Sequence, residues 1–136
     1  MTSRLPVVAI LNSNDDVVEL LRVAIEQAGL IVVSAHVDAI KRGDASLVEF
    51  VNEHAPDVVV YDIVPPYDRS YRFFEHLRHG ALRGPRFVLT STNPRRVEEL
   101  TGVAADHVYE IIGKPFDIDR IVDAVRQAAR ARPTRD

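Results

Sequence analysis

The chain lacks cysteine and tryptophan, and it contains no apolar run of about 18 or more residues. Without cysteine it can form neither disulfides nor thiolate zinc sites, which fits a reducing compartment. Without a membrane-length apolar run or a leader-like start, it is expected to be cytoplasmic and not inserted in a membrane. Its five histidines, at positions 36, 54, 76, 79 and 107, show no metal-binding spacing.

The chain also lacks an excess of charge of one sign. The sequence contains 17 Lys and Arg and 20 Asp and Glu, which gives a net charge of -3 and a pI near 5.9. No nucleic-acid partner is therefore expected. The apolar fraction of 46% and the charged fraction of 27% are typical of a folded globular protein. A length of 136 residues predicts one domain over 1–136, with a loose tail at 132–136 and no output domain.

Short apolar runs alternate with segments of helical period along the chain. Apolar residues between Val17 and Ala28 recur at i, i+3, i+4, i+7 and i+8, and Gly29 follows as the helix terminator. Such runs predict strands at 7–11, 31–33, 58–61, 87–89 and 108–112. The helical patterns predict helices at 17–28, 47–51, 71–77, 97–100 and 118–129, the last of them capped by Asp117. Five strands and five helices in alternation indicate an α/β fold, a doubly wound parallel sheet covered by helices on both faces.

Polar residues follow three of the predicted strands. Asp62 comes after Val58 to Tyr61, Thr90 after the strand at 87–89, and Lys114 after the strand at 108–112. In an open parallel sheet, ligands bind at the carboxyl ends of the strands. We therefore expect an acid, a hydroxyl and an amine to meet at this edge.

Three motifs at these strand ends resemble the receiver domain of bacterial two-component response regulators, and the resemblance extends over essentially the whole chain. The motifs are Tyr61-Asp62-Ile63, Leu89-Thr90-Ser91 and Gly113-Lys114-Pro115-Phe116. Each motif is weak alone, but together and in this order they are a strong signal. The resemblance implies a flavodoxin-like fold with the five-stranded sheet order 2-1-3-4-5.

The resemblance also implies roles for the three residues. Asp62 would accept a phosphoryl group from a sensor histidine kinase or phosphotransfer protein, Thr90 would bind the phosphoryl oxygens, and Lys114 would pair with them. The chemistry agrees, because a carboxylate nucleophile forms an acyl phosphate while a hydroxyl and an ammonium offset charge on the oxygens. Such a domain signals to a downstream protein target and is not classed as an enzyme.

One departure from the family concerns Mg²⁺. Asn12 and Ser13 stand where the family has an acidic pair, so Asp62 would be the sole carboxylate ligand. Each lost charge pair is worth on the order of 4 kcal/mol at about 4 Å and an effective dielectric near 20, before hydration offsets it. No cofactor is therefore expected beyond weak Mg²⁺ binding. Asp15 and Asp16 could partly substitute, although Asp16 with Glu19 fits a helix-capping box better.

Other positions near the expected site depart from the family or remain open. Ile111 stands where the family often carries an aromatic residue, and Tyr109 could serve instead or could be a buried strand residue. The resemblance implies a cis bond at Lys114-Pro115. The segment 65–69, Pro-Pro-Tyr-Asp-Arg, could hold the active-site loop in one shape or present it to a partner.

Three functions remain open from the sequence. The chain is a stand-alone atypical receiver in a phosphorelay, or a phosphorylation-independent pseudo-receiver that acts through protein interaction, or a doubly wound small-molecule binder or hydrolase. The third function is disfavoured because the first strand-to-helix turn has no glycine and Asp62-Ile63-Val64 lacks a second acid. A weak homodimer is also predicted, through the fourth helix, fifth strand and fifth helix. In this dimer, the acidic residues of one copy would face the basic residues of the other, namely Glu98, Glu99 and Glu110 opposite Arg120, Arg126 and Arg130.

Overall fold

A computed structural model of the chain describes residues 5–43, 45–102, 108–109 and 116–131. The strands are β1 (Val7–Leu11), β2 (Ile31–Ala35), β3 (Val58–Ile63), β4 (Arg86–Ser91) and β5 (Val108–Tyr109). The helices are α1 (Asp15–Gln27), α2 (Val37–Arg42), α3 (Leu47–His54), α4 (Tyr67–Arg78), α5 (Pro94–Thr101) and α6 (Phe116–Ala131). Within these ranges, no helix combines the length and apolar character needed to cross a lipid bilayer.

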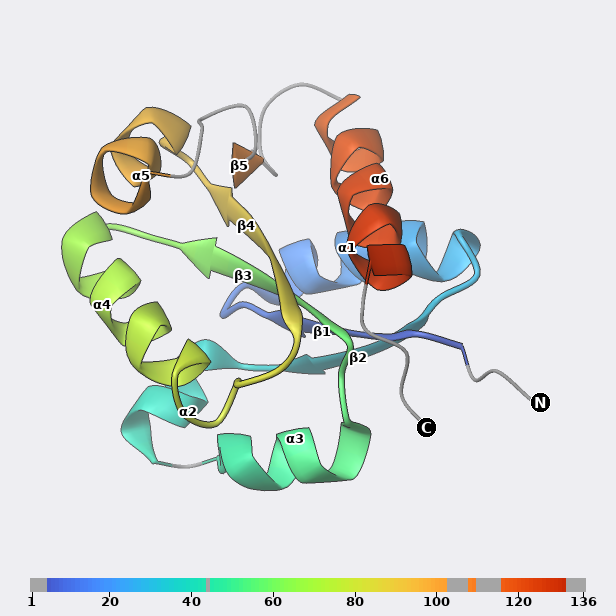
Figure 1. Cartoon of the computed structure of the whole chain (residues 1–136), viewed down its shortest axis with the longest axis horizontal. Helices are drawn as coiled ribbons and strands as arrows, with labels where there is room; N and C mark the ends of the chain where they lie inside the picture. Colours follow the sequence, from blue (N-terminus) through green and yellow to red (C-terminus); the bar gives the residue numbers. More distant parts are fainter. Residues whose placement is uncertain (1–4, 44, 103–107, 110–115, 132–136) are drawn as a thin grey trace.

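All strand pairs described are parallel, and the sheet has the order β2-β1-β3-β4-β5 (Figure 1). The α/β class is confirmed, as is the predicted order of the four long strands. Only two residues of β5 are described, and they pair with Leu89 and Thr90 of β4. The predicted fifth strand therefore lies partly outside the described residues.

Alternate residues of each strand face opposite sides of the sheet, and each side has its own core. Val8, Ile10, Val58 and Val60 pack with α1 and α6 on one side. On the other side, alternate residues of the same strands pack with α2, α3, α4 and α5 (Figure 1). Helices on both faces leave the carboxyl ends of the strands as the open edge.

Two helix predictions were wrong. The structure describes six helices instead of five, because α2 forms between β2 and α3. This helix has six residues and ends at Gly43 with φ 80°. Fewer than two turns give too short a pattern for helical periodicity to emerge. Asp117 is the second residue of α6 and not the residue before it, because the helix already begins at Phe116.

Candidate functional site

Asp62 and Thr90 meet because the register of two neighbouring strands places them opposite each other. Asp62 of β3 and Thr90 of β4 are Cα partners near the carboxyl ends of these strands. The Thr90 Oγ1 donates a hydrogen bond of 2.6 Å to the Asp62 Oδ1. Their predicted proximity is therefore observed, whereas the phosphotransfer roles stay predictions.

The environment of Asp62 disfavours its charged form. Burial raises the pKa of the Asp62 carboxyl above its ordinary value, and the hydrogen bond from Thr90 acts in the opposite direction. The 2.6 Å distance is in the range of hydrogen bonds from a hydroxyl to a carboxylate. Thr90 is completely buried, and its hydroxyl stabilises the carboxylate from the neighbouring strand β4.

The loop after β1 uses its polar side chains to bind backbone groups. The Asn12 Oδ1 accepts a hydrogen bond of 2.8 Å from the Asn14 N–H. The Ser13 Oγ accepts one of 2.9 Å from the Asp38 N–H, which ties this loop to α2. These two oxygens, at the positions where the resemblance implies metal-binding acids, are thus engaged in shaping the loop.

The predicted cap of the first helix was wrong. The N-cap is Asn14, whose Oδ1 accepts hydrogen bonds from the N–H groups of Asp16 and Val17 at 3.0 and 3.1 Å. Asp16 lies inside the first turn of α1, where a negative charge interacts favourably with the helix dipole. The spacing of Asp16 and Glu19 suggested a capping box because, when the start of a helix is not known, an acid in its first turn cannot be told from a capping acid. Asp15 and Asp16 are exposed, and neither lines the pocket beside Asp62.

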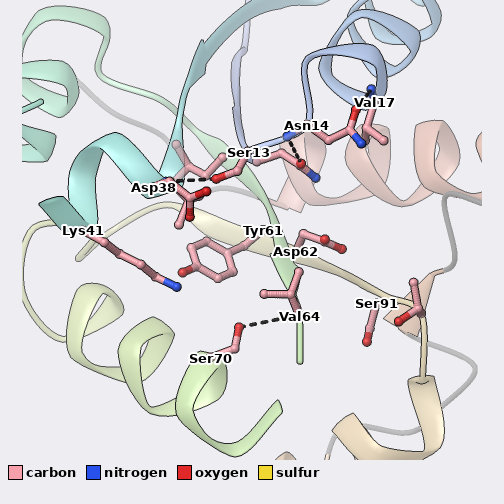
Figure 2. Close-up of a pocket in the computed structure, with 14 residues that line it drawn as sticks. Ser13, Asn14, Val17, Asp38, Lys41, Tyr61, Asp62, Val64, Ser70 and Ser91 are labelled. Carbon is pink, nitrogen blue, oxygen red and sulfur yellow. Dashed lines mark hydrogen bonds between the residues drawn. The ribbon is translucent and has the colours of Figure 1, made fainter. Parts of the chain in front are cut away.

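A pocket of about 350 Å³ opens beside Asp62 at the carboxyl ends of the strands (Figure 2). The loops after β1, β3 and β4 surround it, and α2 closes one side. Its polar and charged lining residues are Asn12, Ser13, Asn14, Asp38, Lys41, Asp62, Ser70, Ser91 and Thr92. Its other lining residues are Leu11, Val17, Val37, Tyr61 and Val64.

The segment after β3 is held by side-chain hydrogen bonds. Pro66 is the N-cap of α4, and the buried Ser70 Oγ accepts a hydrogen bond of 3.1 Å from the Val64 N–H. The Tyr67 hydroxyl lies 2.8 Å from the Thr92 Oγ1, which joins this segment to the loop after β4. The two loops next to Asp62 are therefore connected to each other.

The described residues do not fit a tight Mg²⁺ site. Mg²⁺ demands near-octahedral oxygen coordination and is usually held by one or two carboxylates. No cluster of three or more His, Asp or Glu side chains suited to a metal occurs in the part of the chain that the structure describes. Asp38 and Asp62 are the carboxylates of the pocket, and the Asp62 Oδ1 already accepts the bond from Thr90. Weak Mg²⁺ binding stays a prediction.

Several predicted residues lie outside the described parts of the chain. Lys114, the bond to Pro115, Glu110 and Ile111 belong to these, and the side chain of Tyr109 is likewise not described. The cis peptide bond found in the described residues joins Pro65 and Pro66.

Sequence reasoning missed the contribution of α2 and of the loop after β4. Asp38, Lys41 and Thr92 line the pocket, but none was a candidate site residue. One signal was available, since Lys41 and Lys114 are the only two lysines in a chain with 15 arginines. Lysine is a flexible point charge, and its scarcity marks these two positions.

The fold resembles the solved structures of a response regulator, a sensor protein and a chemotaxis protein. A response regulator from Thermotoga maritima has a TM-score of 0.65 and 15% sequence identity, covering 94% of this chain and 100% of that chain. A sensor protein from Polaromonas sp. JS666 has a TM-score of 0.61 and 20% identity, covering 92% and 96%. The Vibrio cholerae chemotaxis protein CheY4 has a TM-score of 0.61 and 16% identity, covering 92% and 99%.

Sequence comparison alone finds no such relationship: no protein-family model and no curated protein matches the chain. The structural likeness covers nearly the full length of the proteins compared, at a level of identity that shows the fold alone. The chain therefore has the fold of a response regulator receiver domain.

Proposed function

We propose that the chain is an atypical receiver in two-component signal transduction, and that it accepts a phosphoryl group on Asp62. The observation that carries this proposal is the Asp62–Thr90 pair at the carboxyl edge of the sheet, beside an open pocket. Burial disfavours the charged form of this carboxyl group, and carboxyl groups perturbed in this way occur often at sites that bind a ligand or a partner. The receiver fold supplies the signalling context.

The proposed transfer step uses the carboxylate oxygen of Asp62 that does not bind Thr90. Because Oδ1 accepts the bond from Thr90, Oδ2 is the oxygen that would attack phosphorus. The new bond joins Oδ2 to phosphorus while the bond from phosphorus to the donor's imidazole nitrogen breaks. The nitrogen keeps that electron pair and takes a proton from solvent. Thr90 would then bind the phosphoryl oxygens of the product, and Lys114 keeps its predicted role as the cation that pairs with them.

The partners proposed are a sensor histidine kinase or phosphotransfer protein upstream and a protein target downstream. The surface for a weak homodimer would be α5, β5 and α6, the elements predicted from the sequence. Glu98 and Glu99 on α5 are exposed, as are Arg120, Arg126 and Arg130 on α6. Exposed ion pairs contribute about 0–1 kcal/mol each, so association through these charges would be weak.

A second function, a phosphorylation-independent pseudo-receiver, is favoured by the loop after β1. The side-chain oxygens of Asn12 and Ser13 bind backbone N–H groups, an arrangement that maintains the fold without a metal. In this alternative the two connected loops near Asp62 form a surface for a protein partner, and Asp62 stays unmodified.

Labelling with a small phosphodonor separates the two functions. The protein is incubated with acetyl phosphate, with Mg²⁺ or with EDTA, and its intact mass is measured. We expect the gain of one phosphoryl group, which Asp62→Asn abolishes. The matched control is Asp68→Asn, which removes an exposed carboxylate near the start of α4 that does not line the pocket. This variant should gain the phosphoryl group to the same extent as the unmodified chain. Absence of labelling, or labelling that survives Asp62→Asn, would favour the pseudo-receiver.

A further inference from the structure

The two faces of the sheet are covered by segments of opposite charge. Residues 67–96, which form α4, β4 and the start of α5, contain seven arginines and two acids. Helix α1 contains four acids and one arginine. Because α4 and α5 cover one face of the sheet and α1 covers the other (Figure 1), a chain with a net charge of only -3 has a basic side and an acidic side.

The basic side chains of α4 form a stripe along its exposed face. They recur at i, i+3, i+7 and i+10, a spacing that keeps side chains on one side of a helix. The stripe consists of the exposed residues Arg69, Arg72, His76 and the C-cap residue His79. Arginine keeps its positive charge, and an imidazole N–H can donate to a carboxylate. The stripe is therefore suited to an acidic partner.

Two acids beside this stripe are engaged by neighbouring side chains. The Asp68 Oδ2 lies 3.7 Å from the Arg72 Nη2. The Glu75 carboxylate has three side-chain partners, at 2.7, 3.0 and 3.1 Å, which are Tyr71, Arg78 and His79. These acids reduce the positive charge of the face, but the arginines of α4 outnumber them.

Helix α1 has an exposed face with the complementary pattern. Its acids recur with the same spacing, interrupted by one valine, in the exposed set Asp16, Glu19, Val23 and Glu26. Val23 is 46% exposed, and Leu20, three residues before it on the helix, is 48% exposed. This face of α1 therefore presents two aliphatic side chains among acids.

The single cation of α1 is directed to the sheet. The Arg22 Nη2 donates a hydrogen bond of 3.0 Å to the Ser34 Oγ of β2, and its Nη1 donates one of 3.4 Å to the Val32 carbonyl. Its Nε lies 3.6 Å from the Glu19 carboxylate. Arg22 thus tempers one acid of the face and leaves the others to act on a partner.

The two stripes match in either direction. Gaps of three, four and three residues read the same from both ends, so acids meet bases whether the helices run parallel or antiparallel. Each stripe extends over ten residue steps, about 15 Å along a helix. The aliphatic parts of the arginine side chains can cover Leu20 and Val23, so the contact would also remove apolar surface from water.

We propose that α1 of one copy of the chain docks on α4 of a second copy. Because α1 and α4 lie on opposite faces of the sheet, one copy can use both surfaces at once. Such a head-to-tail contact is heterologous, and it produces rings or open chains instead of a closed pair. It differs from the isologous dimer through α5, β5 and α6, and it requires no phosphoryl group. Exposed charge pairs are weak and screened by salt, so we expect association at high protein concentration and low salt.

Two variants disable the two surfaces separately. Val23→Lys places a positive charge in the acidic face of α1, and His76→Glu places a negative charge in the basic stripe of α4. The matched controls make the same changes at exposed positions elsewhere, Val48→Lys on α3 and His36→Glu before α2. In sedimentation velocity at low salt, we expect the unmodified chain and both controls to form species larger than a dimer. Val23→Lys and His76→Glu should each weaken that association about fivefold or more.

Mixing the two variants tests the direction of the contact. Val23→Lys keeps the α4 surface and His76→Glu keeps the α1 surface, so together they should form a 1:1 complex that cannot grow. The fluorescence anisotropy of labelled Val23→Lys should rise with added His76→Glu, stay low with added unlabelled Val23→Lys, and fall again with NaCl.

Three results would overturn the head-to-tail contact. One is an unmodified chain that stays monomeric in these conditions, and another is association of both variants equal to that of the controls. The third is an equal anisotropy response to both added proteins, which would indicate the isologous dimer instead. Phosphorylation of Asp62 has no part in these measurements, so their outcome is independent of the proposed phosphotransfer.

Discussion

Replacing Thr90 with valine removes the hydroxyl that stabilises the Asp62 carboxylate and keeps the side-chain volume. A hydrogen bond to a charged group contributes about 1.5–3 kcal/mol, and a neutral one about 0.5–1.5 kcal/mol. Asp62 is partly exposed, so solvent screening places the expected loss of unfolding free energy in the lower half of the charged-group range, at about 1.5–2 kcal/mol. With an unfolding entropy of about 2.1 cal/mol/K per residue, the 136-residue chain should lose about 5–7 °C in Tm.

The loss caused by Thr90→Val should depend on the charge of Asp62. Burial already raises the pKa of Asp62, and removal of the Thr90 bond raises it further, because that bond favours the ionised form. Thr90→Val should therefore cost about 1.5–2 kcal/mol at pH 8, where Asp62 is charged. Near pH 3.5, below the ordinary Asp value, it should cost only the neutral-bond value of about 0.5–1.5 kcal/mol.

The assay is urea unfolding followed by circular dichroism, in a double-mutant cycle with Asp62→Asn. In the Asp62→Asn background, Thr90→Val should cost about 0.5–1.5 kcal/mol at both pH values, because no charge remains at position 62. Thr90→Ser keeps the hydroxyl and should show no dependence on pH. A Thr90→Val loss that is identical at both pH values and in both backgrounds would refute the charge-assisted bond.

Three further predictions follow from other contacts. Asp62→Asn should stabilise the chain at pH 8, because the raised pKa of Asp62 in the folded state means that its ionisation lowers stability as the pH rises through that pKa. Urea unfolding should show that this gain in stability vanishes below about pH 3.8. A gain that persists below that pH would contradict the prediction. Asn14→Ala should lower the free energy of unfolding by about 1 kcal/mol, because the N-cap of α1 is lost, whereas Asn14→Asp should retain most of that stability. Equal unfolding midpoints for the unmodified chain and Asn14→Ala would show that the cap contributes nothing. Light scattering at low salt should detect a weak dimer that added NaCl dissociates, and a monomer at high protein concentration would remove the homodimer.

The sequence by itself determined the succession of strands and helices except for α2, and it placed Asp62 and Thr90 near the carboxyl ends of their strands. Both conclusions rest on local signals, since an apolar run followed by a polar residue is visible within a few positions. The order of the long strands followed from the family resemblance and is confirmed. Lys114, the third expected site residue, lies outside the described residues, so its position and role stay predictions.

Only the tertiary structure decided which side chains share the pocket. The register of β3 against β4 brought Thr90 to Asp62 at 2.6 Å, and no local pattern encodes a register between strands 28 residues apart. The short helix α2, too brief to show a period, placed Lys41 at the same pocket through packing and the Ser13 contact. Such contacts join distant parts of the chain, and for that reason they appear only once the sheet has formed.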